Sequence, residues 1–238
     1  MLIRLSAYFL VLFFAVTVCH ADTTTGLVGW WKLNEGTGLT TIDSSGRGNT
    51  GTLQNSPTWV NGIRGKALSF DGVSQYVSAG ADTLPSGSAS RTLSGWIYIT
   101  QYANYNIGFD YGGGGGGAVF GFYLNGSTLN FWGNGNDINT GYTINLNQWY
   151  NIVITYDGTN VGMYVNGAEI LTPTPPPAPL NTGTSGMLIG RSYNGDQYPG
   201  LVDDVRVYNR VLTASDVYAL YLSDNKIRNV VMNNVQFK

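Results

Sequence analysis

The chain has 238 residues, a formal charge of −2 and a charged fraction of only 11%, whereas 13% of its residues are aromatic and 33 are glycine. This composition, rich in Tyr, Thr, Asn and Gly and poor in Lys and Glu, favours strands and turns. It excludes a helix bundle or a coiled coil. A near-neutral charge without a basic run also excludes electrostatic binding to nucleic acid.

The first 21 residues have the three parts of a secretory signal peptide. Arg4 precedes a short apolar stretch at residues 7–18, and Cys19-His20-Ala21 supplies a cleavage pattern. The apolar stretch is short for a membrane-spanning helix. We therefore predict a signal peptide at 1–21 and a secreted protein, extracellular or periplasmic, without membrane attachment. The alternative is a retained membrane anchor.

Cleavage after residue 21 would remove the single His and the single Cys, His20 and Cys19. A mature chain without these residue types has no Ser-His-Asp or Cys-His catalysis, no His-ligated zinc and no disulfide. Such a chain depends on its hydrophobic core for stability, and residues 22–224 are numerous enough to form one.

Short apolar and aromatic runs between Gly, Asn, Asp and Ser predict many strands with frequent turns. In residues 149–156, every second residue from Tyr150 onward is apolar or aromatic, which is typical of a strand with one face on a core. Turns at Asp157-Gly158 and Asn166-Gly167 predict an antiparallel meander. The pattern favours an all-β sandwich or barrel. The predicted strands are 28–33, 67–70, 93–99, 119–124, 149–156, 161–165, 187–189 and 205–208.

Two low-complexity stretches interrupt this pattern. Six consecutive glycines at residues 112–117 lack the Lys and Ser/Thr of a phosphate-binding loop, so we predict a mobile loop between strands. The proline-rich residues 172–180 cannot enter a sheet interior. They predict a long surface loop rather than a domain linker.

One short helix is predicted near the C-terminus. Thr213 can cap its free amides, and Asp216 can reach back to Thr213 as a capping box. The face expected against the sandwich carries Val217, Leu220 and Tyr221. The tail, residues 225–238, is predicted to be an extra strand, an edge for self-assembly with a neighbouring chain, or a linker.

Several short motifs follow one another along the chain. They are GWWKLNEGTG at residues 29–38, DSSGRGNTG at 43–51, GKALSFDG at 65–72, LSGWI at 93–97 and GLVDDVRVYNR at 200–210. In this order they resemble the laminin-G-like, concanavalin A-like lectin/glucanase jelly-roll domains of secreted bacterial proteins. The resemblance covers residues 26–223 and implies a jelly roll, a two-sheet antiparallel β-sandwich, with one domain at 22–224. The glycine run and the proline-rich stretch depart from the family pattern as insertions.

One loop has the oxygen-rich composition that calcium prefers. Asp43, Ser45 and Asn49 stand among glycines that let carbonyl groups converge. The resemblance implies a structural calcium ion between this loop and the acidic pair near the last strand, where alternation favours Asp203 over Asp204. The alternative is that these side chains cap turns or pair with arginines, namely Arg191, Arg206 or Arg210.

Carbohydrate binding is the usual role that the resemblance implies, and sugar sites combine an aromatic platform with amide and carboxyl side chains. The best candidate is Trp132 with Asn134, Asn136 and Asp137. The next candidates are tyrosines, namely Tyr102, Tyr105 and Tyr111 before the glycine run, and Tyr193 and Tyr198 near Asn194 and Asp196. The alternative is that these aromatic residues only cover sheet edges.

Glucanases of the resembled family usually carry Glu-x-Asp-x-x-Glu, which is absent, and Glu35 and Glu169 stand at turns. We therefore predict a non-enzyme, a secreted recognition module that binds a glycan or an extracellular surface protein through loop aromatics and is stabilised by calcium. The alternative is a structural or adhesive extracellular protein that makes protein–protein contacts or assemblies.

Overall fold

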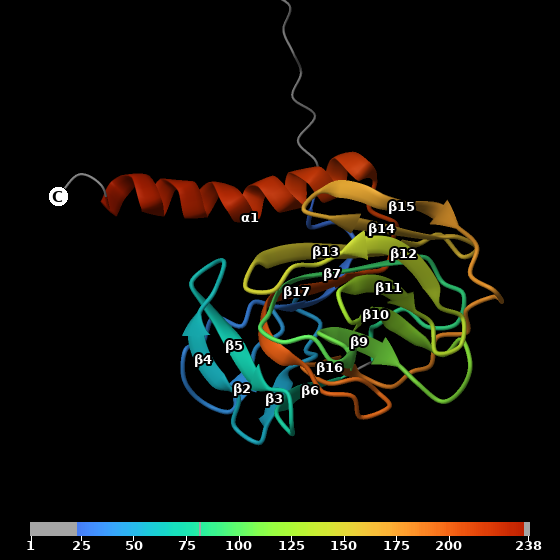
Figure 1. The fold of residues 1–238 in the computed structure, drawn as a ribbon, viewed down its shortest axis with the longest axis horizontal. Helices are drawn as coiled ribbons and strands as arrows, with labels where there is room; N and C mark the ends of the chain where they lie inside the picture. The colour runs from blue at the N-terminus through green and yellow to red at the C-terminus, as the bar shows by residue number, and fades with distance from the viewer. Residues whose placement is uncertain (1–22, 81, 236–238) are drawn as a thin grey trace, which may run out of the picture.

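The computed structural model describes residues 23–80 and 82–235 as two antiparallel sheets packed face to face, with one helix against one of them (Figure 1). The predicted all-β sandwich is confirmed. The predicted signal peptide, residues 1–21, lies outside the described residues. In the described part of the chain, no helix is both long and apolar enough to cross a membrane.

The sheet beside the helix, called the back sheet here, has eight strands within the described residues. Its two longest strands are neighbours near its centre, and the last strand also pairs with the first, which closes the domain. In spatial order the strands are β15 (Ala168–Thr174), β14 (Val161–Val165), β13 (Trp149–Tyr156), β7 (Arg91–Ile99), β17 (Pro199–Tyr208), β5 (Lys66–Asp71) and β4 (Thr58–Asn61), with β1 (Leu27–Trp31) beside β17.

The opposite sheet, called the front sheet, has nine strands in the same described part. In spatial order they are β12 (Ile138–Thr143), β11 (Thr128–Trp132), β10 (Val119–Asn125), β9 (Phe109–Gly112), β16 (Met187–Ile189), β6 (Tyr76–Ala79), β3 (Gly51–Gln54) and β2 (Thr40–Thr41), with β8 (Asn104–Asn106) beside β10. The central strands β9, β10 and β11 supply half of the aromatic side chains in the main buried cluster.

All of the predicted strands are present, and β13, β14 and β16 begin and end at the predicted residues. The two predicted turns join β13, β14 and β15 into the expected meander. The glycine run begins with the last residue of β9 and continues in the connection to β10. The proline-rich stretch begins in β15 and continues as a connection to β16. Strands that the pattern did not predict, such as β2, β8 and β12, are short or polar and give little periodic signal.

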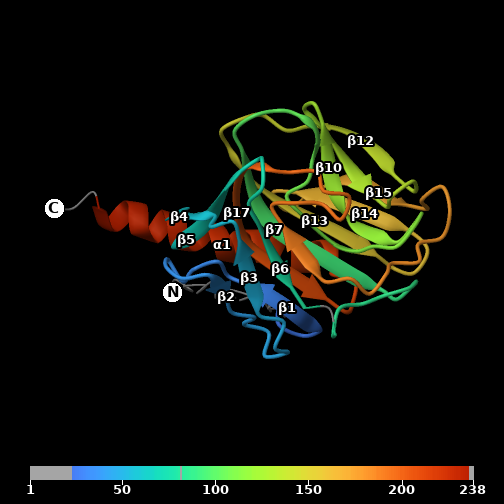
Figure 2. The ribbon, with the colours of Figure 1, turned by 90° about the horizontal axis from the view of Figure 1, so that it is seen from below.

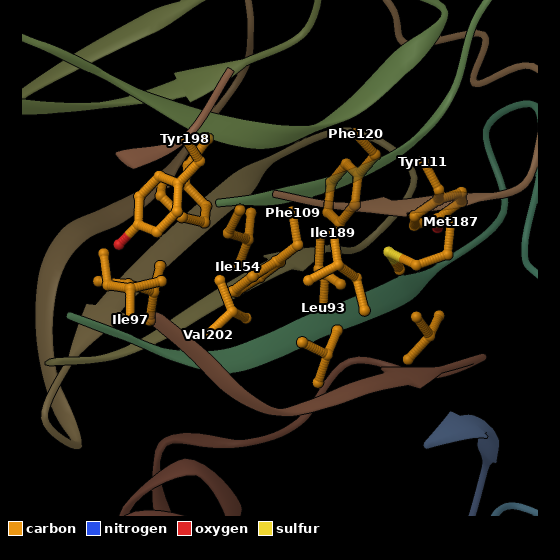
Figure 3. Close-up of a cluster of buried hydrophobic side chains, with 14 of the residues drawn as sticks. Leu93, Ile97, Phe109, Tyr111, Phe120, Ile154, Met187, Ile189, Tyr198 and Val202 are labelled. Atoms are coloured by element: carbon orange, nitrogen blue, oxygen red, sulfur yellow. The ribbon is translucent and has the colours of Figure 1, made fainter. Parts of the chain in front are cut away.

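The core fills the space between the two sheets (Figure 3). Phe109 and Phe120 of the front sheet belong to the same buried cluster as Leu93 and Ile154 of the back sheet. A Cβ atom on Gly95 would lie 2.7 Å from Phe109 Cε1. Glycine at this position of β7 therefore leaves room for an aromatic ring from the facing sheet.

Helix α1 (Ala214–Val235) begins with the predicted capping box. The Thr213 N–H donates to Asp216 Oδ2 at 3.1 Å, and the Asp216 N–H donates to Thr213 Oγ1 at 3.2 Å. Val217 and Leu220 are buried together with Val153, a residue on the outer face of the back sheet. The first turns of the helix therefore cover that face, as predicted.

The predicted extra strand after residue 224 is wrong, because residues 225–235 continue the helix. The stretch from the capping box to residue 235 contains neither Gly nor Pro, so nothing in it stops the helix. Figures 1 and 2 show the helix extending past the strands. Residues 236–238 lie outside the described residues, and self-assembly through the tail stays a prediction.

Candidate functional site

The outer face of the front sheet carries a small apolar cluster of its own. Alternation along β10 sends Phe120 into the inter-sheet core and turns Val119 and Tyr123 to the other face. There they pack with Ile107 and Trp132. Trp132 is only 5% exposed, so loops cover this cluster rather than leaving it open to solvent.

A pocket of 340 Å³ lies beside this cluster where three segments meet. They are β8, the connection between β11 and β12, and the connection between β16 and β17. The lining residues are Tyr105, Trp132, Asn134, Gly135, Asp137, Asn194 and Asp196. Four of the predicted sugar-binding residues, Tyr105, Trp132, Asn134 and Asp137, are thus brought together.

The exposed aromatic ring of the pocket is Tyr105, at 52% exposure. Its backbone has a φ of 59°, and its ring centroid lies 5.3 Å from that of Tyr123. Because Tyr123 packs on the Trp132 cluster, Tyr105 is supported from below. Trp132, the predicted platform, lines the same pocket but is only 5% exposed, so Tyr105 offers a ligand the larger aromatic surface.

Tyr111 and Asn136, two further predicted ligand residues, do not line the pocket. Tyr111 follows Phe109 by two positions and so faces the core, where burial raises the pKa of Tyr111 to about 12. Asn136 is buried beneath the glycine run, and a Cβ atom on Gly117 would lie 2.7 Å from its Nδ2. Asn136 is therefore positioned to support that loop.

Hydrogen bonds within the loops fix the polar side chains of the pocket. Asp137 Oδ1 accepts from the Gly133 N–H at 2.9 Å, which closes a tight turn. Asn134 Nδ2 donates to the Gly115 carbonyl at 2.9 Å and ties this turn to the glycine run. Burial raises the pKa of Asp137 above its ordinary value, against the opposing N–H groups of Gly133 and Gly135.

Asn194 and Asp196 enter the pocket from a distant part of the chain. Ser192 Oγ donates to Asp196 Oδ2 and accepts from the Asp196 N–H, both at 2.9 Å, so the Asp196 carboxylate is held in place. Sequence reasoning gave these two residues only as neighbours of candidate tyrosines. The signal for them is a polar Asn-Gly-Asp turn directly after Tyr193, between two strands. Tyr198, in contrast, is fully buried.

A buried carboxyl group holds the connection between β16 and β17 from below. Asp110 of β9 is fully buried, and its Oδ2 accepts from the Tyr193 N–H at 3.3 Å. Burial, opposed by that N–H and reinforced by the charge of Asp196, raises the pKa of Asp110 well above its ordinary value. Asp110 therefore stays protonated to a higher pH than an exposed aspartate.

The predicted calcium loop is closed by hydrogen bonds from its own surroundings. Asp43 Oδ1 accepts from the N–H groups of Trp30 and Ser45 at 2.9 Å, and Oδ2 accepts from Asn49 N at 2.9 Å and Asn49 Nδ2 at 3.1 Å. Burial acts to raise the pKa of Asp43, but these bonds bring it below its ordinary value. Each carboxylate oxygen already accepts twice, which leaves no lone pair for a cation.

Asp203 is not brought to that loop. Trp31 pairs with Asp43 on one edge of β1 and with β17 on the other, so β1 separates the two carboxylates. Asp203 Oδ2 accepts from the N–H groups of Ile63 at 2.9 Å and Arg64 at 3.1 Å.

The donor set at Asp43, Ser45, Asn49 and Asp203 therefore does not fit a calcium ion. Within residues 23–80 and 82–235, no three His, Cys, Asp or Glu side chains lie together as a group that could hold a metal ion. The alternative expectation describes the contacts better, since Asp43 closes its turn. The neighbouring Asp204 Oδ2 accepts from Arg206 Nη2 at 2.7 Å.

We expect the melting temperature to be the same in calcium chloride and in a chelator, because hydrogen bonds already hold the Asp43 loop closed. Differential scanning calorimetry of the full chain measures it. A midpoint that rises with calcium and falls again on chelation would restore the sequence-based prediction.

Asp203 also carries a pH-dependent contribution to stability. Burial, reinforced by the carboxylates of Asp204 and Asp224, raises the pKa of Asp203 to about 8. In the unfolded chain an aspartate has a pKa of about 3.9. Unfolding between these values releases a proton, so this group's contribution is full below about pH 4 and is lost as the pH rises toward 8.

We expect Asp203→Asn to melt at the same temperature as the wild type near pH 4 and several degrees higher at pH 8, because the amide resembles the protonated acid. Thermal unfolding monitored by circular dichroism across this range measures the difference. Asp82→Asn, at an exposed position, is the matched control and should not alter the pH dependence. Equal melting of wild type and Asp203→Asn at pH 8 would contradict the assignment.

Comparison with protein families gives one match. The model for the concanavalin A-like lectin/glucanases superfamily, of laminin G type, matches residues 71–218. This segment runs from the end of β5 into α1 and includes every strand that frames the pocket. A search of curated proteins found no match.

Several solved structures have the same fold. Domain 4 of AbnA, a GH43 extracellular arabinanase from Geobacillus stearothermophilus in complex with arabinotriose, aligns with a TM-score of 0.69 and 22% identity over 82% of this chain and 98% of that one. The binding domain of Paraclostridial Mosquitocidal Protein 1 aligns with a TM-score of 0.65 and 18% identity, over 83% of this chain and 52% of that one. Trypanosoma rangeli sialidase in complex with sialic acid aligns with a TM-score of 0.59 and 19% identity, over 84% of this chain and 33% of that one. The chain thus spans about half and a third of the last two, and these identities show the fold alone.

Proposed function

The chain belongs to the concanavalin A-like lectin/glucanase superfamily, and on this premise we propose that it is a non-catalytic module that binds an uncharged saccharide in the pocket beside Tyr105. One observation carries the proposal. One short strand and two connections from distant parts of the chain place an exposed aromatic ring beside two amide and two carboxylate side chains in one concave site.

These groups match the chemistry of a sugar. The Tyr105 ring offers a flat apolar surface for the C–H face of a pyranose or furanose. The carboxylates of Asp137 and Asp196 accept hydrogen bonds from hydroxyl groups, and the amides of Asn134 and Asn194 both donate and accept. A few fixed polar groups around an apolar surface are typical of small-ligand sites.

The charge of the pocket favours a neutral sugar. Its lining contains Asp137 and Asp196 and, within the described residues, no Lys, Arg or His. An anionic sugar would bring a third negative charge close to these two carboxylates, which costs free energy in a partly desolvated site. Sialylated and uronic acid-containing glycans are therefore expected to bind least.

The similar structures include a toxin binding domain as well as chains of enzymes, so the fold does not decide between binding and catalysis. Binding is supported by the pocket's own chemistry. Glycoside hydrolysis needs one protonated and one ionised carboxyl group flanking the scissile bond. Here Asp196 Oδ2 accepts from Ser192 and Asp137 Oδ1 accepts from the Gly133 N–H, which fixes the two carboxylates to receive sugar hydroxyl groups on their remaining lone pairs.

We extend the proposal to an exported protein, on the sequence of residues 1–21. N-terminal sequencing of the protein recovered outside the cytoplasm should give a start near Asp22. Recovery of an intact N-terminus inside the cell would contradict export.

We expect wild-type protein to bind neutral glycans on an array, and Tyr105→Ala to bind them about five- to tenfold more weakly because the stacking surface is lost. Asp137→Asn should weaken neutral glycans and relieve the discrimination against anionic ones. Titration calorimetry with the best array glycan gives the affinities, and a reducing-sugar assay on the same glycan should show no release.

Tyr218→Ala is the matched control, because Tyr218 is 53% exposed on α1, away from the pocket lining. Equal loss in Tyr105→Ala and Tyr218→Ala would contradict the assigned site. Release of reducing sugar would make the protein an enzyme. No glycan binding together with self-association would favour the structural or adhesive alternative.

A further inference from the structure

A second pocket, of 450 Å³, lies on the other side of the glycine run. Its polar lining includes Ser86, Asn181, Thr182 and Thr184, and the backbone of Gly113 and Gly114 forms another wall. No charged side chain lines it among the described residues. The pocket therefore offers hydroxyl, amide and backbone groups, which suit an uncharged polyhydroxyl ligand.

The walls of this second pocket are held rigidly. Gly87 and Thr182 exchange two backbone hydrogen bonds, of 2.7 and 3.1 Å. The buried Arg91 guanidinium donates to the carbonyls of Pro85 at 3.0 Å and Gly87 at 2.7 Å. A ligand would therefore meet a site that is already formed, with little ordering cost on binding.

The polar groups of this wall differ in how far a ligand could reach them, and Thr182 is the buried one. The residue is 2% exposed, and its Oγ1 has no hydrogen-bond partner within the part of the chain that the structure describes. A buried hydroxyl without a partner costs about 1–3 kcal/mol. Because this oxygen is buried from solvent, the exposed polar side chains of the pocket, those of Ser86, Asn181 and Thr184, are the ones that a ligand would contact.

The glycine run connects this pocket to the one beside Tyr105. Asn134, which lines the first pocket, donates through Nδ2 to Gly115 O and accepts through its carbonyl from the Gly117 N–H. Gly113, which lines the second pocket, lies directly against Tyr193, since an added Cβ would be 2.3 Å from that ring. The Tyr193 ring is 42% exposed, and the next residue, Asn194, lines the first pocket.

We propose that the two pockets are the ends of one elongated site for a neutral oligosaccharide chain, with the Tyr193 ring and the exposed backbone of residues 114–116 between them. This inference rests on the proposed function and specifies its ligand as a polymer segment rather than a single sugar. Because the residues between the pockets are glycines, no side chain obstructs the oligosaccharide there. Added Cβ atoms on Gly114 and Gly115 would meet nothing within 4 Å.

Length dependence tests the inference. The probes are β-1,4-linked glucose oligomers and α-1,5-linked arabinose oligomers, from dimer to octamer, titrated calorimetrically into the full chain. Wild-type affinity for the better series should rise by about tenfold or more between the shortest and the longest member, as the second pocket becomes occupied.

Asn181→Ala should reduce the ratio of longest-member to shortest-member affinity about three- to tenfold, since it removes an exposed amide from the second pocket. It should fold as well as the wild type, because the Asn181 side chain is exposed. Tyr193→Ala should reduce the same affinity ratio by a similar factor, whereas Tyr105→Ala should weaken the binding of oligomers of every length. Tyr218→Ala is again the control.

The two proposals fail in different ways. Affinity that is independent of length, with the same ratio in Asn181→Ala and Tyr193→Ala as in wild type, overturns the elongated site and leaves the pocket beside Tyr105 standing. No binding of any member of either series, and no neutral glycan on the array, overturns both.

Discussion

The constraint on which the structure depends is that both sheets carry apolar side chains on both faces, so each outer face needs a cover. On the back sheet, Val153 and Tyr208 point away from the core and are buried by the first turns of α1. On the front sheet, Val119 and Trp132 point away from the core and are buried by loops. A helix gives a smooth cover, whereas loops give an uneven one with concave sites.

The helical cover is fixed by buried charges. Asp224 on α1 is fully buried and accepts from Trp96 Nε1 at 2.9 Å and from Arg64 Nη1 at 2.8 Å. Arg206 of β17 contacts Asp224 at 3.3 Å and Asp204 at 2.7 Å. Removing one member of such a network leaves a buried charge unpaired, which destabilises strongly. The network therefore sets where the helix lies on the sheet more than it adds to net stability.

The sequence predicted what depends on local periodicity and failed where distant segments meet. Period-two runs and the Asp-Gly and Asn-Gly turns indicated the back-sheet meander, and the capping box indicated the start of α1. The same alternation also places Tyr111 on the inward face of its strand, because Tyr111 follows Phe109 by two positions. The sequence pattern alone therefore argues against Tyr111 as a ligand-binding residue. Alternation alone could not show that loops cover Trp132, because that cover comes from residues far away in the chain. The calcium prediction meets a related difficulty, since oxygen-rich composition does not show that N–H groups already donate to those oxygens.

The loop cover and the proposed binding site are one feature. Keeping water from the outer face of the front sheet requires loops to pack closely on it, and glycine permits this where Gly113 lies against the Tyr193 ring. Closely packed loops leave pockets between them. The residues that line these pockets can change without disturbing the core, because core residues such as Phe109 and Leu93 lie between the two sheets, on the inner faces. On the proposed function, ligand choice resides in residues 105, 132–137 and 193–196. A fold shared with an arabinanase domain and a toxin binding domain does not by itself transfer their ligands.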